Sequence, residues 1–77
     1  MNSISQKEAA YQVLCSFLRR PLFSPGDVLR TTNLLNYPPN VLNYGLPFAA
    51  QLGWIKLWPD RTRFELTDLG DEILRRQ

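Results

Sequence analysis

The sequence contains no histidine and a single cysteine, Cys15, and its four glycines are widely scattered. The absence of histidine removes the most common general base and the most common metal ligand of proteins. A lone cysteine can form neither an internal disulfide nor, without histidine, a Cys–His catalytic pair. No glycine-rich loop is present that could hold a phosphate group. These absences argue against an enzyme and predict no cofactor, no metal site and no small-molecule substrate.

Long apolar segments are absent as well. No stretch approaches the roughly 18 apolar residues that cross a bilayer, and residues 1–8 lack the apolar core of a signal peptide. We therefore expect no membrane partner and a cytoplasmic location, in keeping with the scarcity of cysteine. Seventy-seven residues, 44% of them hydrophobic, predict one folded domain over residues 1–77. The net charge of +2 is compatible with a nucleic-acid partner without requiring one.

The first helix is predicted by a cap and an apolar stripe. Ser5 followed by Glu8 fits a capping box, in which the serine oxygen accepts a backbone N–H of the first turn. Apolar residues then recur at spacings of three and four, as on one face of an α-helix. These stripe residues are Ala10, Val13, Leu14, Phe17 and Leu18. Arg19 and Arg20 suit the negative end of the helix dipole, and Pro21 ends the helix.

A second helix start is indicated at Ser24. This serine fits a cap, Pro25 suits the first helical position, and Asp27 adds a negative charge to the first turn. The pattern predicts a short helix that ends near Asn33. Its predicted buried face consists of Val28, Leu29 and Leu34.

A third helix is predicted over residues 39–52, after a turn that contains two prolines. Apolar residues follow a helical period through this segment, but Gly45 and Pro47 lie inside it. An interior proline removes a hydrogen bond and costs about 3 kcal/mol. The sequence therefore predicts either a kinked helix over residues 39–52 or a break near Gly45 and Leu46.

Gly53 suits the end of this helix, where a left-handed backbone is favoured, and a hairpin follows. Residues 54–58 have the composition of a strand, residues 59–62 are typical of a turn, and residues 63–66 alternate as a half-buried strand does. The predicted inner face consists of Ile55, Leu57, Phe64 and Leu66. The predicted outer face consists of Trp54, Lys56, Trp58, Arg63 and Glu65. Thr67 then caps a last, short helix.

The order helix, helix, turn, helix, hairpin, helix resembles that of the winged helix-turn-helix superfamily. Residues 52–55 (LGWI) and 63–70 (RFELTDLG) are similar to the signature L…G-x-I…(R)-(Y/F)-x-L-T-x-x-G of many bacterial winged-helix regulators. The likeness extends over residues 23–74. It implies an α+β fold, namely a three-helix bundle with a two-stranded antiparallel β-hairpin (the wing) and a short C-terminal helix. The same scaffold serves DNA binding, protein docking and oligomerisation, so the resemblance indicates fold better than function.

In DNA-binding members of the superfamily the third helix enters the major groove and the wing contacts the backbone. Carried over, asparagine and glutamine of the third helix could pair with adenine, and wing cations could contact phosphates. The predicted nucleic-acid-binding residues are Arg30, Asn40, Asn43, Tyr44, Lys56, Arg61 and Arg63, with Gln51 as a further candidate. The first hypothesis is thus a small regulator of transcription, of bacterial, phage or plasmid type, that binds double-stranded DNA as a dimer. The alternative roles are turn and cap chemistry for the asparagines and a solvated hairpin tip for the wing arginines.

The third helix departs from this pattern because residues 31–55 contain no charged residue. A helix that enters a DNA groove usually brings lysine or arginine with it. The departure motivates a second hypothesis, a protein-interaction module that docks on a protein partner or forms a homodimer. Its predicted interface consists of Tyr37, Tyr44, Phe48, Trp54 and Trp58. We rank DNA binding slightly ahead, because the fold more often serves it and the wing carries suitable charges.

Overall fold

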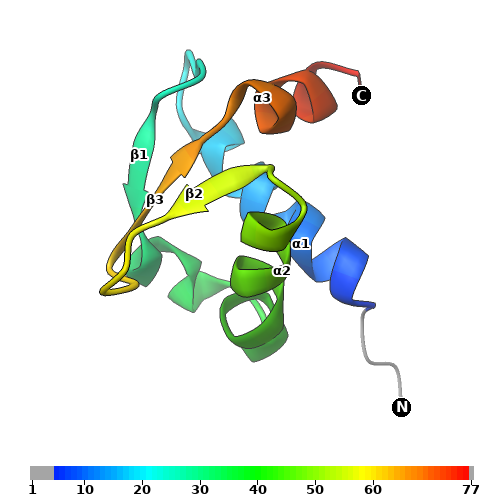
Figure 1. Ribbon diagram of the computed structural model, residues 1–77, viewed down its shortest axis with the longest axis vertical. Helices are drawn as coiled ribbons and strands as arrows, with labels where there is room; N and C mark the ends of the chain where they lie inside the picture. The colour runs from blue at the N-terminus through cyan, green and yellow to red at the C-terminus, as the bar shows by residue number, and fades with distance from the viewer. Residues whose placement is uncertain (1–4, 77) are drawn as a thin grey trace.

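The computed structural model describes residues 5–76, so residues 1–4 and 77 of the predicted domain lie outside the described residues. The chain is an α+β domain in which helices pack on one face of a three-stranded antiparallel sheet (Figure 1). None of the helices in residues 5–76 combines the length and the apolar character that a membrane crossing requires. In chain order the elements are α1 (Gln6–Cys15), the 3-10 turn η1 (Ser16–Arg19), β1 (Val28–Arg30), the 3-10 helix η2 (Thr31–Asn36), the π-helical turn η3 (Val41–Gly45), α2 (Leu46–Gln51), β2 (Ile55–Leu57), β3 (Arg63–Leu66) and α3 (Asp68–Arg75).

Helix α1 begins where the sequence predicts. The Ser5 side-chain oxygen accepts the Glu8 backbone N–H at 3.1 Å, which confirms the predicted cap. The stripe residues are buried except for Leu18, which is 50% exposed, so its predicted burial is wrong. After Cys15 the chain tightens into η1, where each residue turns further than in an α-helix, and Leu18 leaves the apolar face.

The predicted second helix at Ser24 is wrong. Ser24 donates its backbone N–H to the Asp27 carboxylate at 3.0 Å, but its hydroxyl accepts no backbone N–H in the hydrogen bonds of residues 5–76. Gly26 has a φ of 96°, a left-handed conformation that an α-helix does not contain. After η1, the next helical element is η2, which follows β1. Of the face that the second helix was predicted to bury, Leu34 is buried, whereas Val28 is 38% exposed.

The sheet has one strand more than the predicted hairpin. Strand β3 lies in the centre, with β1 on one side and β2 on the other. Phe64 of β3 is fully buried, and its register partners are Leu29 of β1 and Leu57 of β2. Its ring meets Phe17 edge to face, with 5.4 Å between the ring centroids. The hairpin's inner face is therefore confirmed, and β1 extends it.

The third helical segment runs over residues 39–51 and changes its hydrogen-bonding pattern in the middle. In η3 the chain makes a π-helical turn, and the Leu46 N–H bonds to the Val41 carbonyl five residues earlier. Pro47 lies in the first turn of α2, where its missing N–H costs little. Gly45 approaches α1 so closely that a Cβ would lie 2.5 Å from the Ala9 carbonyl oxygen. The predicted irregularity near Gly45 and Leu46 is confirmed as one widened turn.

Trp54 precedes β2 and does not follow the alternation of the strand. Gly53 has a φ of 79°, as expected at the end of the helix, and this left-handed residue interrupts the pattern. Trp54 is only 8% exposed and belongs to the core, so its predicted outward position is wrong. The Thr67 hydroxyl donates to the Trp54 carbonyl at 2.8 Å and accepts the Gly70 N–H at 3.1 Å. The second bond confirms Thr67 as the cap of α3.

Candidate nucleic-acid interface

The solvent-facing side of the sheet carries two adjacent rows of side chains. Arg30 and Arg63 are register partners in β1 and β3, and Trp58 donates its backbone N–H to the Arg63 carbonyl at 2.9 Å. These three residues form the first row. Lys56 and Glu65 are register partners in the second row. Three of the predicted cations, Arg30, Lys56 and Arg63, therefore lie exposed on one face.

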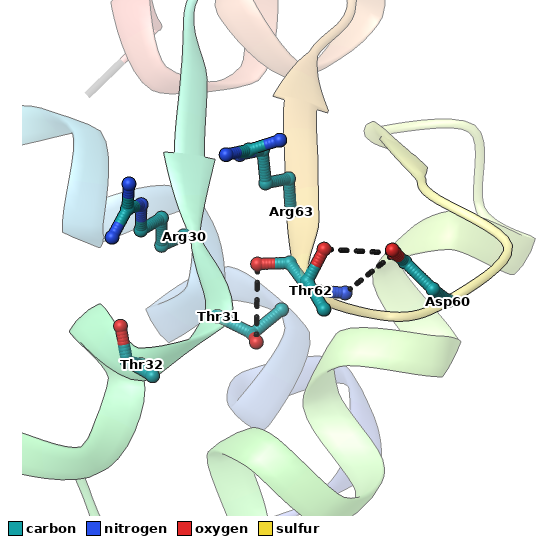
Figure 2. Close-up of a pocket in the computed structure, with 6 residues that line it drawn as sticks. All are labelled: Arg30, Thr31, Thr32, Asp60, Thr62 and Arg63. Carbon is teal, nitrogen blue, oxygen red and sulfur yellow. Dashed lines mark hydrogen bonds between the residues drawn. The ribbon is translucent and has the colours of Figure 1, made fainter.

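Arg30 and Arg63 also face a common hollow of about 520 Å³, shown in Figure 2. We call it the β1–β3 hollow, and it is lined by Arg30, Thr31, Thr32, Asp60, Thr62 and Arg63. In Figure 2 the Arg63 side chain is turned toward β1, and the Arg30 side chain extends from that strand on the side away from β3. The sequence alone assigned neither the threonines nor Asp60 to a site, because they meet the arginines only when β1 pairs with β3.

The turn between β2 and β3 is fixed by its own hydrogen bonds. Asp60 accepts the Thr62 backbone N–H at 3.0 Å and the Thr62 hydroxyl at 2.8 Å. These bonds, first that of the backbone N–H, lower the pKa of Asp60, and nearby Arg63 contributes in the same direction. Arg61 has a φ of 62°, and its carbonyl accepts the Thr31 hydroxyl at 3.0 Å. The tip of the hairpin is therefore tied to the end of β1.

The arginines beside the hollow form no close ion pair within residues 5–76, although Asp60 lies near Arg63. The ion pairs in this part of the chain join Arg20 to Asp27, Arg75 to Asp71 and Arg76 to Glu72. Arg30 and Arg63 take part in none of them, although they are register partners on neighbouring strands. Like charges directly opposite in a sheet destabilise it, so an anion in the hollow would relieve a repulsion that the fold leaves in place.

The residues of the third helix that were predicted to contact DNA bases lie apart from this hollow. Asn43 and Tyr44 in η3 are exposed, Tyr44 by 56%, and Gln51 in α2 is exposed as well. Asn40 is half-buried and makes no capping bond with its side chain. None of the four lines the β1–β3 hollow. In Figure 1, η2 and the turn between β2 and β3 both lie toward the lower left, and the helix that carries these residues lies to their right.

The predicted aromatic interface is only partly at the surface. Trp54 is in the core, and Tyr37 and Phe48 are half-buried against it. Tyr44 is exposed, and Trp58 is half-buried beside Lys56 in a smaller hollow. Sequence reasoning missed one apolar side chain at the surface of the charge-free segment: Leu35 in η2 is 67% exposed. The five aromatic residues therefore do not form one continuous exposed patch.

Cys15 offers no reactive thiolate. It is half-buried, and burial raises its pKa, while a hydrogen bond with Tyr11 acts in the opposite direction and is the smaller effect. The pKa of Tyr11 is raised as well, chiefly by burial. Both groups stay protonated near neutral pH. The chemistry of the candidate surface is thus that of guanidinium and hydroxyl groups, which bind anions.

The chain matches no protein-family model, no curated protein and no solved structure at a significant level. The charges and contacts of the sheet's outer face and of the third helix are therefore the features that bear on its function.

Proposed function

We propose that this chain is a small, non-enzymatic winged-helix protein that binds double-stranded DNA and regulates transcription in the cytoplasm of a bacterium or its phage or plasmid. The observation that carries the proposal is the pair Arg30 and Arg63, which are exposed, opposite each other in register and in no close ion pair within the described part of the chain. Such a pair suits a polyanion, because phosphate neutralisation supplies most of the non-specific affinity for DNA.

The third helix would contribute readout rather than charge. Its exposed Asn43 and Gln51 carry side-chain amides, which can pair bidentately with adenine in the major groove. Phosphate contacts fix the register of a protein on DNA, and base contacts specify the sequence. In this proposal the two tasks are divided, with the cations on the sheet and hairpin and the polar groups on the helix.

The affinity for DNA of any sequence tests the proposal. We expect fluorescence anisotropy at about 50 mM salt to show binding of a mixed-sequence duplex, weakened about tenfold or more by Arg63→Glu. Lys7→Glu is the matched control, because it makes the same charge reversal in the exposed first turn of α1, away from the sheet. Absence of binding at low salt, or equal losses in both variants, would count against DNA binding.

A protein-interaction module is the second candidate. It is favoured by the exposure of Leu35 and Tyr44, two apolar side chains in a segment of residues 31–55 that carries no charge. Sedimentation of the protein and of Tyr44→Ala and Leu35→Ala separates the candidates. Self-association lost in both variants, with DNA affinity at background, would favour the module. DNA binding that Leu35→Ala leaves unchanged, with the oligomeric state of the wild type kept in that variant, would favour the regulator.

A further inference from the structure

We infer that the β1–β3 hollow is a binding site for one phosphate group, contacted by the two arginines that line it, Arg30 and Arg63. The assignment of this phosphate to the DNA backbone, as a phosphodiester, rests on the proposed function. The anion site itself rests on the geometry of the hollow alone. Three observations carry it, namely the arginine pair, the pattern of used and unused hydroxyls and the open shape of the hollow, while Asp60 limits the strength of the site.

The arginine pair supplies charge and direction. Arg30 and Arg63 are fixed opposite each other by the register of β1 and β3, and both line the hollow. A guanidinium group donates two parallel N–H bonds to the oxygens of a phosphate or carboxylate, and two such groups match an anion with several oxygens. A tetrahedral phosphate can present oxygens to both sides at once, whereas a planar carboxylate has two oxygens in one plane.

The hydroxyl groups show which donors are still available. Thr31 donates its hydroxyl to the Arg61 carbonyl at 3.0 Å, and Thr62 donates its own to Asp60 at 2.8 Å. Among the hydrogen bonds of residues 5–76, Thr32 has no side-chain partner, and in Figure 2 its hydroxyl points toward the Arg30 side. Thr32 is therefore the hydroxyl that remains to bind an anion, while its two neighbours hold the turn in place.

Asp60 sets the strength of the site. Its carboxylate lines the same hollow, and its pKa is lowered first by the Thr62 backbone N–H, so it is ionised near neutral pH. The negative charge competes with an incoming phosphate for Arg63. Weak, reversible binding of each phosphate suits a protein that must slide along DNA between sites.

The shape of the hollow favours a group on a polymer. It is open to solvent and lined by arginine, threonine and aspartate, and none of these lining residues is an aliphatic or aromatic one. A backbone phosphate can enter such a hollow while the chain continues on both sides. Inorganic phosphate tests the anion site, and duplex DNA tests the source of the anion.

The first experiment titrates inorganic phosphate into the protein at low ionic strength and follows the Arg30 and Arg63 side-chain Nε–H and the Thr32 amide by NMR. We expect saturable shifts at these groups, weakened about threefold or more in Arg30→Gln and in Arg63→Gln and unchanged in Lys7→Gln. Asp60→Asn keeps an oxygen for Thr62 and removes the competing charge, so it should tighten phosphate binding about two- to fivefold. Non-saturable shifts, or weakening of the same size in Lys7→Gln, would overturn the anion site.

The second experiment identifies the source. Each phosphate of a bound duplex is neutralised in turn by ethylation, for the wild type and for Arg63→Gln. We expect at least one phosphate whose ethylation weakens the wild type and has no further effect on the variant. If phosphate titrates as expected and DNA binds without such a coupled position, the hollow takes a free phosphate and the assignment to a backbone phosphodiester is wrong. If no duplex binds, the proposed function fails, while the phosphate titration still decides the anion site.

Discussion

The two faces of the sheet differ in what their side chains contribute to the stability of the fold. On the inner face Phe64 is fully buried and meets the Phe17 ring edge to face, and its register partners Leu29 and Leu57 are apolar. On the outer face Arg30 opposes Arg63, and neither takes part in an ion pair among residues 5–76. The packing of the inner face stabilises the folded chain, whereas the like charges of Arg30 and Arg63 destabilise it. A charge arrangement that folding does not need is the better candidate for function.

The largest expected effect on stability comes from a substitution on the inner face of the sheet. Phe64→Ala should lower the free energy of unfolding by about 3–5 kcal/mol, because it removes a ring from the centre of the core and leaves a cavity. Urea unfolding measures the loss. Leu35→Ala is the matched control at an exposed position and should change the free energy by less than about 0.5 kcal/mol. Similar losses in the two variants would contradict this placement of the core.

The next effect concerns the helices that cover the inner face. Gly45→Ala should destabilise the protein by about 1–3 kcal/mol, since its Cβ would lie 2.5 Å from the Ala9 carbonyl oxygen. This loss should outweigh the gain of about 1 kcal/mol that alanine gives over glycine in a helix. Because the nearest atom belongs to the backbone, Ala9→Gly should not rescue the variant. Thermal unfolding that shows Gly45→Ala to be more stable than the wild type would contradict the close crossing.

A smaller effect of opposite sign is expected on the outer face. Arg63→Gln should raise the free energy of unfolding by about 0.2–1 kcal/mol at low salt, because it removes a like-charge pair. Lys56→Gln makes the same change of charge opposite Glu65. It should lower the free energy of unfolding, because it removes a pair of opposite charges. Both effects should fade near 1 M salt, where the Debye length is about 3 Å. Urea unfolding at two salt concentrations measures them, and destabilisation by Arg63→Gln would show that the pair is not repulsive.

The smallest effect is the pH dependence of the turn. The folded structure lowers the pKa of Asp60 below its usual value of 3.8, so the fold favours the ionised form. The contribution of ionised Asp60 to the stability of the fold is therefore fully present above pH 3.8. It is lost as the pH falls through the lowered pKa of this carboxyl. The Thr62 amide resonance should report this transition by NMR, and Asp60→Asn should abolish it. A midpoint above 3.8 would contradict the hydrogen bonds assigned to Asp60.

Elements that depend on neighbours in the sequence were predictable. The Ser5 and Thr67 caps, the left-handed Gly53 and the alternation of β3 all follow from contacts within a few residues. The irregularity at Gly45 was predictable too, because a proline inside a helix must disturb its hydrogen bonds. Local chemistry decided each of these features, so local patterns were sufficient.

Features that depend on distant pairing were not predictable. Strand β1 has only three residues, and it exists because β3, more than thirty residues later, completes its hydrogen bonds. The helix predicted there followed from Ser24 and Asp27, but the Ser24 hydroxyl accepts no backbone N–H in the described part of the chain. Arg63 was a candidate from the composition of the hairpin, but its position opposite Arg30 follows only from the register of the sheet. Both arginines of the hollow were therefore candidates from the sequence, whereas the threonines and Asp60 beside them, and the assembly of the site, were not.

The salt dependence of duplex binding tests the central claim most directly. Four cations, Arg30, Lys56, Arg61 and Arg63, are assigned to phosphates, so the logarithm of the binding constant should fall with the logarithm of salt concentration with a slope of about 3 to 4. Arg63→Gln should reduce this slope by about one, and Lys7→Gln should leave it unchanged. An unchanged slope in Arg63→Gln would contradict the claim that the outer face of the sheet binds DNA.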